Sequence, residues 1–567
     1  MWTSPRFILL AFVVLFTLLN VTSFMRTSAT WDEPQHLAAG YAALAARDFR
    51  VEPENPPLVR LWAALPLRYM RSGVLDTAAI DATTPTEWVT GPLFAFSHDV
   101  LYVDGDADRR LYAARFMILL LGLVLGALVF LWAREWLGPG PAIVALAAYT
   151  LEPNIAAHAS LVTTDLGVTC FVFGAVYSLW RLCRNPTPLN ASAFVLVFVA
   201  AQLTKFSAIL LGPIVVVLLG IAVAGTRALR WRTAIWIAVA AAVATFAAVW
   251  LAYGFRHAPS GNTGWLFRFQ DDPVARQRLP SLAAMVGWID DHRLLPNAFS
   301  QGFLLGQAKV QARDAFLAGH YSTTGWWYYF PLAFLMKTPS SLVVLSVAGI
   351  AVCVVRRAAL GAANAVFVIV PVVAFMTLAM ATPLNIGLRH LLPIYPFCLL
   401  LAAAAVTALS SSRRGRLVPA VAAVVWALEL GRTYPHNLAF FNQWVGGPAN
   451  GHRYLVDSNL DWGQDLKGLK GWMTERGVDQ VALGYFGTAD ASYYGIRYTP
   501  LPDTGRFAGG PPVPPRLPGW FAVSATVLSG VYGDDRSRAF YRPLRDRQPS
   551  ATIGYSIHLY WIEQPWW

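Results

Sequence analysis

Long apolar stretches recur along most of this chain and limit its possible folds more than any other feature. A helix needs about 20 apolar residues to cross the hydrocarbon core of a bilayer. Eleven stretches approach that length, at 7–25, 111–133, 141–157, 165–181, 191–203, 206–224, 232–253, 340–355, 363–381, 390–410 and 417–431. The shorter ones predict tilted or partly re-entrant helices. We therefore expect an all-α polytopic membrane protein with about 11 transmembrane helices.

The low share of charged residues also supports a membrane protein. Charged residues make up 13% of the 567 positions, about half the share in a soluble protein, so most of the chain cannot face water. The net charge of +12 does not indicate a nucleic-acid partner, because the basic residues fall between the apolar stretches. The four cysteines lie in or beside apolar stretches, so neither a disulfide framework nor a cysteine zinc site is predicted.

The orientation follows from arginines in alternate connectors, which are expected on the cytoplasmic side of a membrane. Only Glu135 opposes them there. The pattern predicts a multi-pass protein of the cell membrane with a cytoplasmic N-terminus and an extracytoplasmic C-terminal domain. A cleaved signal peptide is the alternative for the first stretch, but 28–30 is a poor cleavage site. The arginines are Arg6, Arg134, Arg181, Arg184, Arg227, Arg230, Arg232, Arg356, Arg357, Arg413, Arg414 and Arg416.

Two domains follow from this topology. Residues 1–431 form the transmembrane domain, with outer loops at about 26–110 and 254–338, and residues 432–567 form an extracytoplasmic domain. The second domain is predicted to be a small α/β unit. Its expected elements are strands at Gln480–Phe486 and Trp520–Thr526, a helix near Asp461–Arg476 and an alternating segment at Ile553–Ile562.

Two adjacent carboxylates, Asp32 and Glu33, follow the first apolar stretch directly. In a helix they would lie four and three positions before His36, so one face could present a base with a histidine partner, or ligands for a divalent ion. Thr30 and Glu33 also fit a capping box that begins a loop helix. Both interpretations stay open, because capping by Glu33 leaves Asp32 free.

The same loop contains a proline-rich turn at 52–60, which either shapes the loop or directs Glu54, Asn55 or Arg60 into a cavity. Asp165 stands at the start of the fourth stretch. There it could simply meet the helix dipole, or it could contribute to a site, since ionisable residues at the bilayer edge are functional candidates.

Basic side chains are expected at a depth in the membrane similar to that of the carboxylates. Lys205 interrupts a long apolar run, and Arg389 and His390 precede the tenth stretch. A positively charged group at the membrane surface suits a lipid phosphate, although interfacial anchoring would explain the same positions. The segment Asp457–Asp465 contains many hydrogen-bonding side chains and an indole, Trp462, which fit either acceptor binding or turn and capping interactions. A nucleotide-binding Walker A sequence and a dinucleotide glycine fingerprint are absent from the sequence.

Several short segments occur in an order that resembles the C-superfold polytopic glycosyltransferases, close to the protein O-mannosyltransferase and aminoarabinose transferase branch. The resemblance covers roughly the first 430 residues. The segments are Trp31-Asp32-Glu33, Asn55-Pro56-Pro57-Leu58, Thr164-Asp165-Leu166, Thr204-Lys205-Phe206 and Leu388-Arg389-His390-Leu391-Leu392-Pro393.

The resemblance implies transfer of a hexosyl or pentosyl group from a polyprenyl-phosphate donor to a hydroxyl of a protein, lipid or glycan at the outer membrane face, with inversion. Asp32 would then be the general base, with Glu33 and Asp165 as supporting or alternative carboxylates. Lys205 and Arg389 would neutralise the departing lipid phosphate. Some relatives bind a divalent metal near this cavity, and Glu54 or His36 would be the candidates here, but the sequence does not decide metal dependence.

Two other classes of function are compatible with the topology. A transporter or flippase of lipid-linked sugars would also need many spans and polar groups near lipid head groups. It would not need the Asp32-Glu33 pair at the surface, and the internal repeat common in transporters is absent from the sequence. A non-catalytic membrane assembly protein is disfavoured by the many ionisable residues at the bilayer edge. The glycosyltransferase is therefore the preferred hypothesis.

Overall fold

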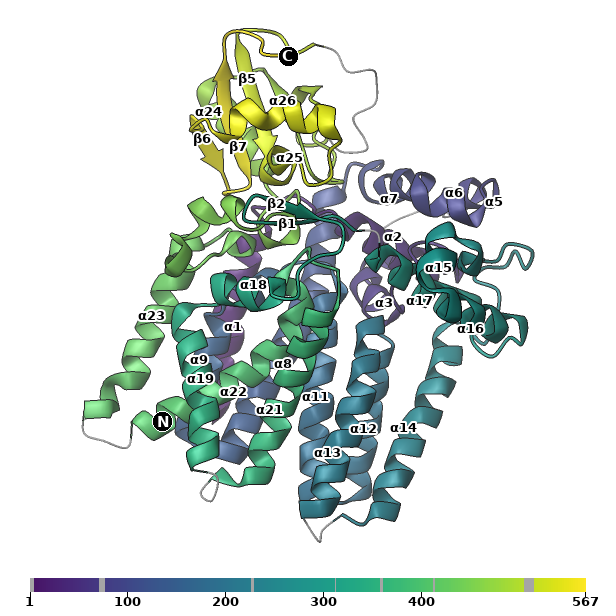
Figure 1. Cartoon of the computed structure of the whole chain (residues 1–567), viewed down its shortest axis with the longest axis vertical. Helices are drawn as coiled ribbons and strands as arrows, with labels where there is room; N and C mark the ends of the chain where they lie inside the picture. Colours follow the sequence, from purple (N-terminus) through teal and green to yellow (C-terminus); the bar gives the residue numbers. More distant parts are fainter. Residues whose placement is uncertain are drawn as a thin grey trace.

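The structure, a computed structural model, describes residues 5–70, 77–225, 229–311, 313–356, 360–410, 414–503 and 514–567. Arg227, Arg357 and Arg413 of the orientation pattern lie outside these residues. A helical bundle carries a small sheet-containing domain at one end, and α1 begins near the opposite end (Figure 1). The predicted fold class, a polytopic helical protein with a small C-terminal α/β unit, is confirmed.

Seven helices among the described residues are long and apolar enough to cross a membrane, or eight if a pair bent by 117° is one span. The bent pair is α18 (Tyr329–Lys337) and α19 (Ser340–Val355). The seven are α1 (Pro5–Phe24), α8 (Ala107–Leu137), α11 (Thr164–Arg184), η1 with α13 (Phe206–Leu210, Leu211–Gly225), α14 (Trp231–Ala252), α21 (Ala362–Ala381) and η3 with α22 (Leu388–Ile394, Tyr395–Leu409).

Three further apolar helices are shorter than these spans. They are α9 (Pro139–Thr150), α12 (Pro188–Gln202) and α23 (Val418–Thr433), the last preceded by η4 (Arg414–Leu417). All three coincide with predicted stretches, two of which the sequence indicated as short. The membrane body is confirmed, whereas the count of eleven spans stays a prediction.

The innermost helices are α11 and α22, which are far more buried than the other spans. Close packing against α22 depends on a glycine in α19. A Cβ atom on Gly349 would lie 2.1 Å from the carbonyl oxygen of Leu401, so a larger residue would force the two helices apart. The two innermost helices begin next to the polar groups of the candidate site, and their packing therefore fixes where those groups stand.

The two long loops lie at the end of the bundle that carries the C-terminal domain (Figure 1). The first contains α2 (Glu33–Ala46), α3 (Leu58–Ala64), α4 (Leu67–Met70), α5 (Ala78–Asp81), α6 (Pro85–Thr90) and α7 (Pro92–Tyr102). The second contains η2 (Phe269–Asp271), α15 (Pro273–Arg278), α16 (Pro280–Asp291), α17 (Asn297–Val310) and the hairpin β1 (Ala315–Leu317) with β2 (His320–Ser322). A short helix, α10 (Pro153–Ala159), joins α9 to α11.

The C-terminal domain is built on a mixed five-stranded sheet of order β4-β3-β5-β7-β6. Strand β3 is parallel to β4 and β5, and β7 is antiparallel to β5 and β6. The strands are β3 (Gln480–Gly484), β4 (Arg497–Pro500), β5 (Gly519–Ser524), β6 (Ala551–Ile553) and β7 (Ile557–Ile562). The helices are α24 (Leu466–Arg476), α25 (Ala525–Ser529) and α26 (Asp535–Arg545). The predicted alternating segment is thus a hairpin.

A chain of short turns connects α23 to this domain. These turns are η5 (Asn437–Ala439), η6 (Gln443–Val445), η7 (Pro448–Arg453) and η8 (Asp457–Asn459). Lys337 of α18 holds the connection, because its buried ammonium donates to the carbonyl oxygens of Leu438 and Phe440 at 3.0 Å each and also to that of Asn459. The C-terminal domain is therefore tied to the bundle by the segment that also reaches the candidate site.

Candidate active site

Asp32 lies at the junction between the first outer loop and the C-terminal domain. Its Oδ2 atom accepts a hydrogen bond from Nη1 of Arg389 at 2.8 Å. The backbone before it is fixed by the C-terminal segment, because the amide of Trp31 donates to the carbonyl of Trp462 at 2.9 Å. Asp32 takes the N-cap position of α2 without making a side-chain cap, so its carboxylate is left to Arg389. The side chain of Asp32 is 25% exposed.

A second carboxylate, Asp165, meets the same arginine from the first turn of α11. Its Oδ1 atom lies 2.5 Å from Nζ of Lys205, and its Oδ2 atom lies 3.7 Å from Nη1 of Arg389. Lys205 stands in the break between α12 and η1, as the sequence predicted. Asp32, Arg389, Asp165 and Lys205 therefore form a continuous series of alternating charges, which we name the charge chain.

Arg389 is enclosed by the C-terminal segment. Its guanidinium carbon lies 4.2 Å from the ring centroid of Trp462, a cation–π contact. The preceding residue is also held, since the amide of Leu388 donates to Oδ1 of Asn459 at 2.9 Å. A Cβ on Gly387 would lie 2.1 Å from Oγ of Ser458, so the close approach of the two segments favours glycine there. The sequence left open whether 457–465 serves structure or binding, and here it orders Arg389.

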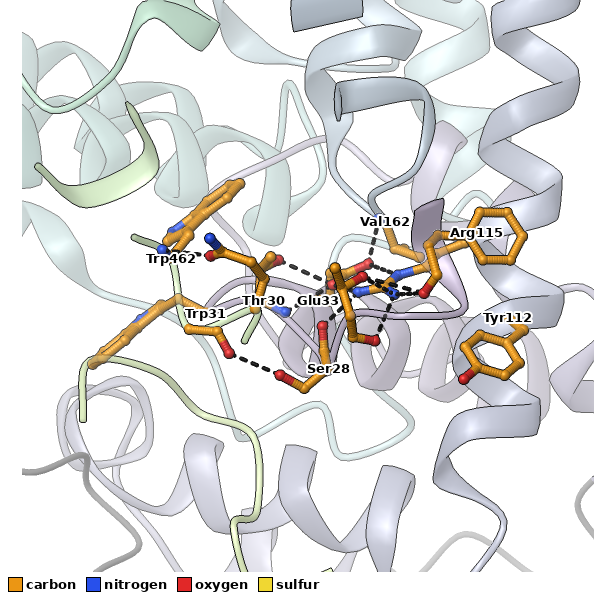
Figure 2. A network of polar contacts seen from close by, with 12 residues as sticks. Ser28, Thr30, Trp31, Glu33, Tyr112, Arg115, Val162 and Trp462 are labelled. Carbon is orange, nitrogen blue, oxygen red and sulfur yellow. Dashed lines mark hydrogen bonds and ion pairs between the residues drawn. The ribbon is translucent and has the colours of Figure 1, made fainter. Parts of the chain in front are cut away.

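The Glu33 side chain points away from the charge chain into the protein interior. Its carboxylate forms two hydrogen bonds with Arg115 of α8, at 2.6 and 2.8 Å, and both side chains are fully buried (Figure 2). It also accepts from the backbone amides of Thr30 and Val162, each at 2.8 Å. Only the Glu33 half of the predicted capping box is present, because the Thr30 amide donates to Glu33 whereas Asp32, not Thr30, is the N-cap of α2. With all these partners Glu33 fixes the loop, and its place supports a structural role.

The proline-rich turn holds itself together through Glu52. Burial opposes ionisation of this carboxyl, but Arg60 at 2.6 Å and His36 at 3.2 Å outweigh burial and lower its pKa to about 2. His36 therefore pairs with Glu52, and the idea that it partners Asp32 is wrong. Asn55 donates to Oε1 of Glu52 at 3.0 Å and accepts from Thr164 at 3.4 Å, next to Asp165.

Two further expected residues lie apart from the charge chain contacts. Glu54 pairs with Lys309 of α17 and is partly exposed. His390 is partly buried beside Phe330, with ring centroids 6.3 Å apart, and its Nε2 atom has no hydrogen-bond partner among the described residues. His36 and Glu54, the candidate metal ligands, each bind a different partner. Within the described ranges, no group of three His, Cys, Asp or Glu side chains could hold a metal ion.

The sequence did not single out a set of aromatic and charged residues beside Asp32. Trp31 stacks on Phe486 of the C-terminal domain, with ring centroids 4.7 Å apart, and Phe486 stacks on Tyr532 at 5.6 Å. The Tyr532 hydroxyl bonds Asp457, whose Oδ2 lies 3.7 Å from Nη2 of Arg313. The sequence could have indicated Arg115, because it is an arginine inside an apolar stretch. The stack of Trp31, Phe486 and Tyr532 could not be predicted, because these residues come from three separate segments of the chain.

Comparison with known proteins agrees with the expected resemblance. Residues 107–252 match the family model described as dolichyl-phosphate-mannose-protein mannosyltransferase. No curated protein matches the chain.

Similar solved structures include ArnT from Cupriavidus metallidurans in the apo state (14% identity, 97% of each chain, TM-score 0.34). The same protein bound to undecaprenyl phosphate is similar at 13% identity over 98% of each chain, with a TM-score of 0.32. The Archaeoglobus fulgidus oligosaccharyltransferase complex with zinc and sulfate is similar at 14% identity over 89% of this chain and 59% of that chain, with a TM-score of 0.40.

Proposed function

We propose that this chain, a C-superfold glycosyltransferase by its match to the mannosyltransferase family model, transfers a sugar from a polyprenyl-phosphate donor to an acceptor hydroxyl. The acceptor oxygen bonds to the anomeric carbon while the bond from that carbon to the phosphate oxygen breaks. The acceptor proton passes to Asp32. The lipid phosphate leaves with the electron pair, and Lys205 and Arg389 balance its charge. A single displacement of this kind inverts the anomeric centre.

One observation carries the choice of base: the two carboxylates of the charge chain differ in exposure and in partners. Asp165 is 2% exposed and contacts both cations, so it is suited to hold Lys205 and Arg389 in position. The Asp32 side chain is 25% exposed, and among the described residues its carboxylate forms an ion pair with Arg389 but not with Lys205. A base must reach a proton on an incoming substrate. Asp32 meets this requirement and Asp165 is the positioning residue.

The contact between Asp32 and Arg389 also suggests how the donor prepares the base. A phosphate is a strong bidentate partner for a guanidinium. A donor phosphate that binds Arg389 competes with Asp32 for the same N–H groups, and it thereby frees the Asp32 carboxylate to accept a proton. Lys205, 17% exposed, adds a second charge on the same side. The site thus separates a proton-accepting end from a phosphate-binding end.

The remaining expected residues support this site from outside the charge chain. Glu33 fixes the loop that carries Asp32, and the turn built by Glu52, Asn55 and Arg60 lies against the start of α11 beside Asp165. We place the reaction at the extracytoplasmic face. The acceptor is a hydroxyl of a protein, lipid or glycan that approaches between the first outer loop and the C-terminal domain.

The proposal is tested by giving the purified full chain a panel of polyprenyl-phosphate sugars and measuring release of polyprenyl phosphate. Asp32→Asn should lower turnover about 100- to 10,000-fold, the usual contribution of a general base. Asp106→Asn is the matched control, because it changes an exposed carboxylate of the same loop that makes no side-chain cap. Asp165→Asn should raise the KM for the donor, since Lys205 loses its partner. Wild-type turnover by Asp32→Asn would exclude it as the base.

A further inference from the structure

A pocket lies between the C-terminal domain and the β1–β2 hairpin of the second outer loop, and none of its lining residues belongs to the charge chain. It has a volume of about 650 Å³ and is bounded by η7, the β1–β2 hairpin, α25, the end of α26 and the β6–β7 hairpin. Volumes of this size accommodate small ligands or head groups. The sugar-transfer proposal makes no use of this pocket, so a ligand bound here neither requires nor supports that proposal.

Arginines dominate the charge of this pocket. Arg453, Arg545 and Arg547 line it, and the part of the chain that the structure describes gives none of them an ion-pair partner. Arg545 donates Nε to the carbonyl of Leu528 at 2.6 Å, and Arg547 donates Nη2 to that of Trp561 at 2.9 Å. Each guanidinium has five N–H donors, so both keep donors for a ligand. Asp546 also lines the pocket and offsets part of this charge.

The inner wall of the pocket holds a histidine whose bonding is incomplete. His558 is the second residue of β7 and is 3% exposed. Its Nε2 atom is buried and has no hydrogen-bond partner among the residues described. Its ring lies 4.7 Å from that of His452, which also lines the pocket. A buried polar atom without a partner destabilises the protein, and a hydrogen bond from a ligand atom would recover that loss.

We propose that this pocket binds a phosphate-bearing group, with Arg453, Arg545 and Arg547 at its entrance and His558 at its inner wall. Three guanidinium groups match a doubly charged anion, and planar guanidinium forks bind phosphate oxygens in pairs. Burial lowers the pKa of His558 to about 3, so its imidazole is neutral near pH 7 and offers one N–H donor and one acceptor. The neutral ring adds a directed hydrogen bond to the charge of the arginines.

The pocket is tested with the full chain in nanodiscs of phosphatidylcholine and with inorganic phosphate as the probe, at constant ionic strength. Binding is measured from 31P NMR line broadening. The wild type should bind saturably, and the double variant Arg453→Gln/Arg547→Gln should bind at least about tenfold more weakly. Both side chains are exposed, so the variant is expected to fold, which its Tm checks. Arg476→Gln, an exposed arginine of α24 outside the pocket, should bind as the wild type does.

Nanodiscs containing phosphatidylglycerol separate the two sources of phosphate. If the anionic lipid abolishes wild-type binding of inorganic phosphate but leaves residual binding by the double variant unchanged, the natural occupant is a lipid head group. If the wild type binds inorganic phosphate equally well in both kinds of nanodisc, the natural occupant is a soluble phosphate-bearing group. The proposal would be overturned if the wild type did not bind inorganic phosphate saturably in phosphatidylcholine nanodiscs. It would also be overturned if the double variant bound phosphate as tightly as the wild type.

Discussion

Nη1 of Arg389 donates to Oδ2 of Asp32 across 2.8 Å, although 357 positions separate the two residues in the chain. The first comes from η3 beneath the outer surface of the bundle and the second from the start of the first outer loop. Their contact joins two segments that the sequence placed on one side of the membrane. Loss of the Arg389 charge would leave the Asp32 carboxylate without this ion pair, whereas Arg389 without Asp32 would still meet Asp165 at 3.7 Å.

Glu33 and Arg115 are expected to affect folding more than chemistry. Removal of one partner from a buried ion pair leaves an uncompensated charge and costs about 3–5 kcal/mol. Glu33→Gln should therefore lower the Tm of the purified chain strongly, and Glu33→Leu/Arg115→Met should be milder than either single change. Glu135→Gln, in the exposed pair with Arg181, should cost less than about 1 kcal/mol. A stable but inactive Glu33→Gln variant would assign Glu33 to the chemistry.

Trp462 should influence donor binding through Arg389. A desolvated cation–π contact contributes up to about 2 kcal/mol, which corresponds to about 30-fold in affinity. Trp462→Ala should raise the KM for the polyprenyl-phosphate sugar by about 3- to 30-fold, whereas Trp462→Phe keeps an aromatic face and should stay closer to the wild type. The backbone bond from Trp31 to residue 462 is present in both variants. Equal KM values for Trp462→Ala and Trp462→Phe would show that the aromatic ring at position 462 does not influence donor binding through Arg389.

Ionisation of the buried Asp461 carboxyl group is expected to make the stability of the fold depend on pH. Asp461 is fully buried, accepts from the amide of Thr526 at 2.7 Å, and burial raises its pKa to about 7. An unfolded aspartate titrates near pH 4. Because the folded pKa is the higher one, this group stabilises the fold below about pH 4 and its contribution is lost as the pH rises through about 7.

We therefore expect Tm to fall between pH 5 and pH 8, and we expect Asp461→Asn, which cannot ionise, to reduce that fall. The measurement is thermal unfolding of the full chain across this range. Asp479→Asn removes an exposed carboxyl from the same domain and should keep the wild-type profile. An unchanged fall in Asp461→Asn would show that other groups cause it.

The proposed orientation is testable by labelling single cysteines in whole cells. Cysteines at positions 104 and 503 should react with a membrane-impermeant maleimide, and one at position 414 should react only after the cells are opened. The four native cysteines are buried and unpaired, so they give a low background. Labelling of position 414 in intact cells would reverse the orientation.

Much of the architecture could be predicted because lipid imposes simple rules. Apolar length marked the helices, and the break at Lys205 was visible because an ammonium inside an apolar run needs an end or a partner. The sequence marked the segments of β3, β5 and the β6–β7 hairpin as strand-like, but it did not mark β4. The shorter helices α9, α12 and α23 show the limit of these rules, since hydropathy measures length and not whether a short helix crosses the bilayer.

The candidate site was only partly predictable, for a physical reason. The sequence identified Asp32, Asp165, Lys205 and Arg389 as ionisable groups at similar depth. It could not divide roles between Asp32 and Glu33, because that division depends on which carboxylate meets Arg115. It offered Asp32 or Glu33 as a possible partner of His36, whereas the structure pairs His36 with Glu52, which the fold of the proline-rich turn brings close. Such pairings are set by tertiary packing and leave no mark in local spacing.

The stacking of Trp462 on Arg389 has a consequence for biosynthesis. Ribosomes deliver residues in order, so Asp32, Asp165 and Lys205 enter the membrane long before the indole that covers Arg389 exists. The nascent chain therefore holds these three charged residues without the indole that covers Arg389 until the last fifth of the given sequence has been made and folded. A chain released before residue 462 would contain Arg389 without the aromatic ring that covers it.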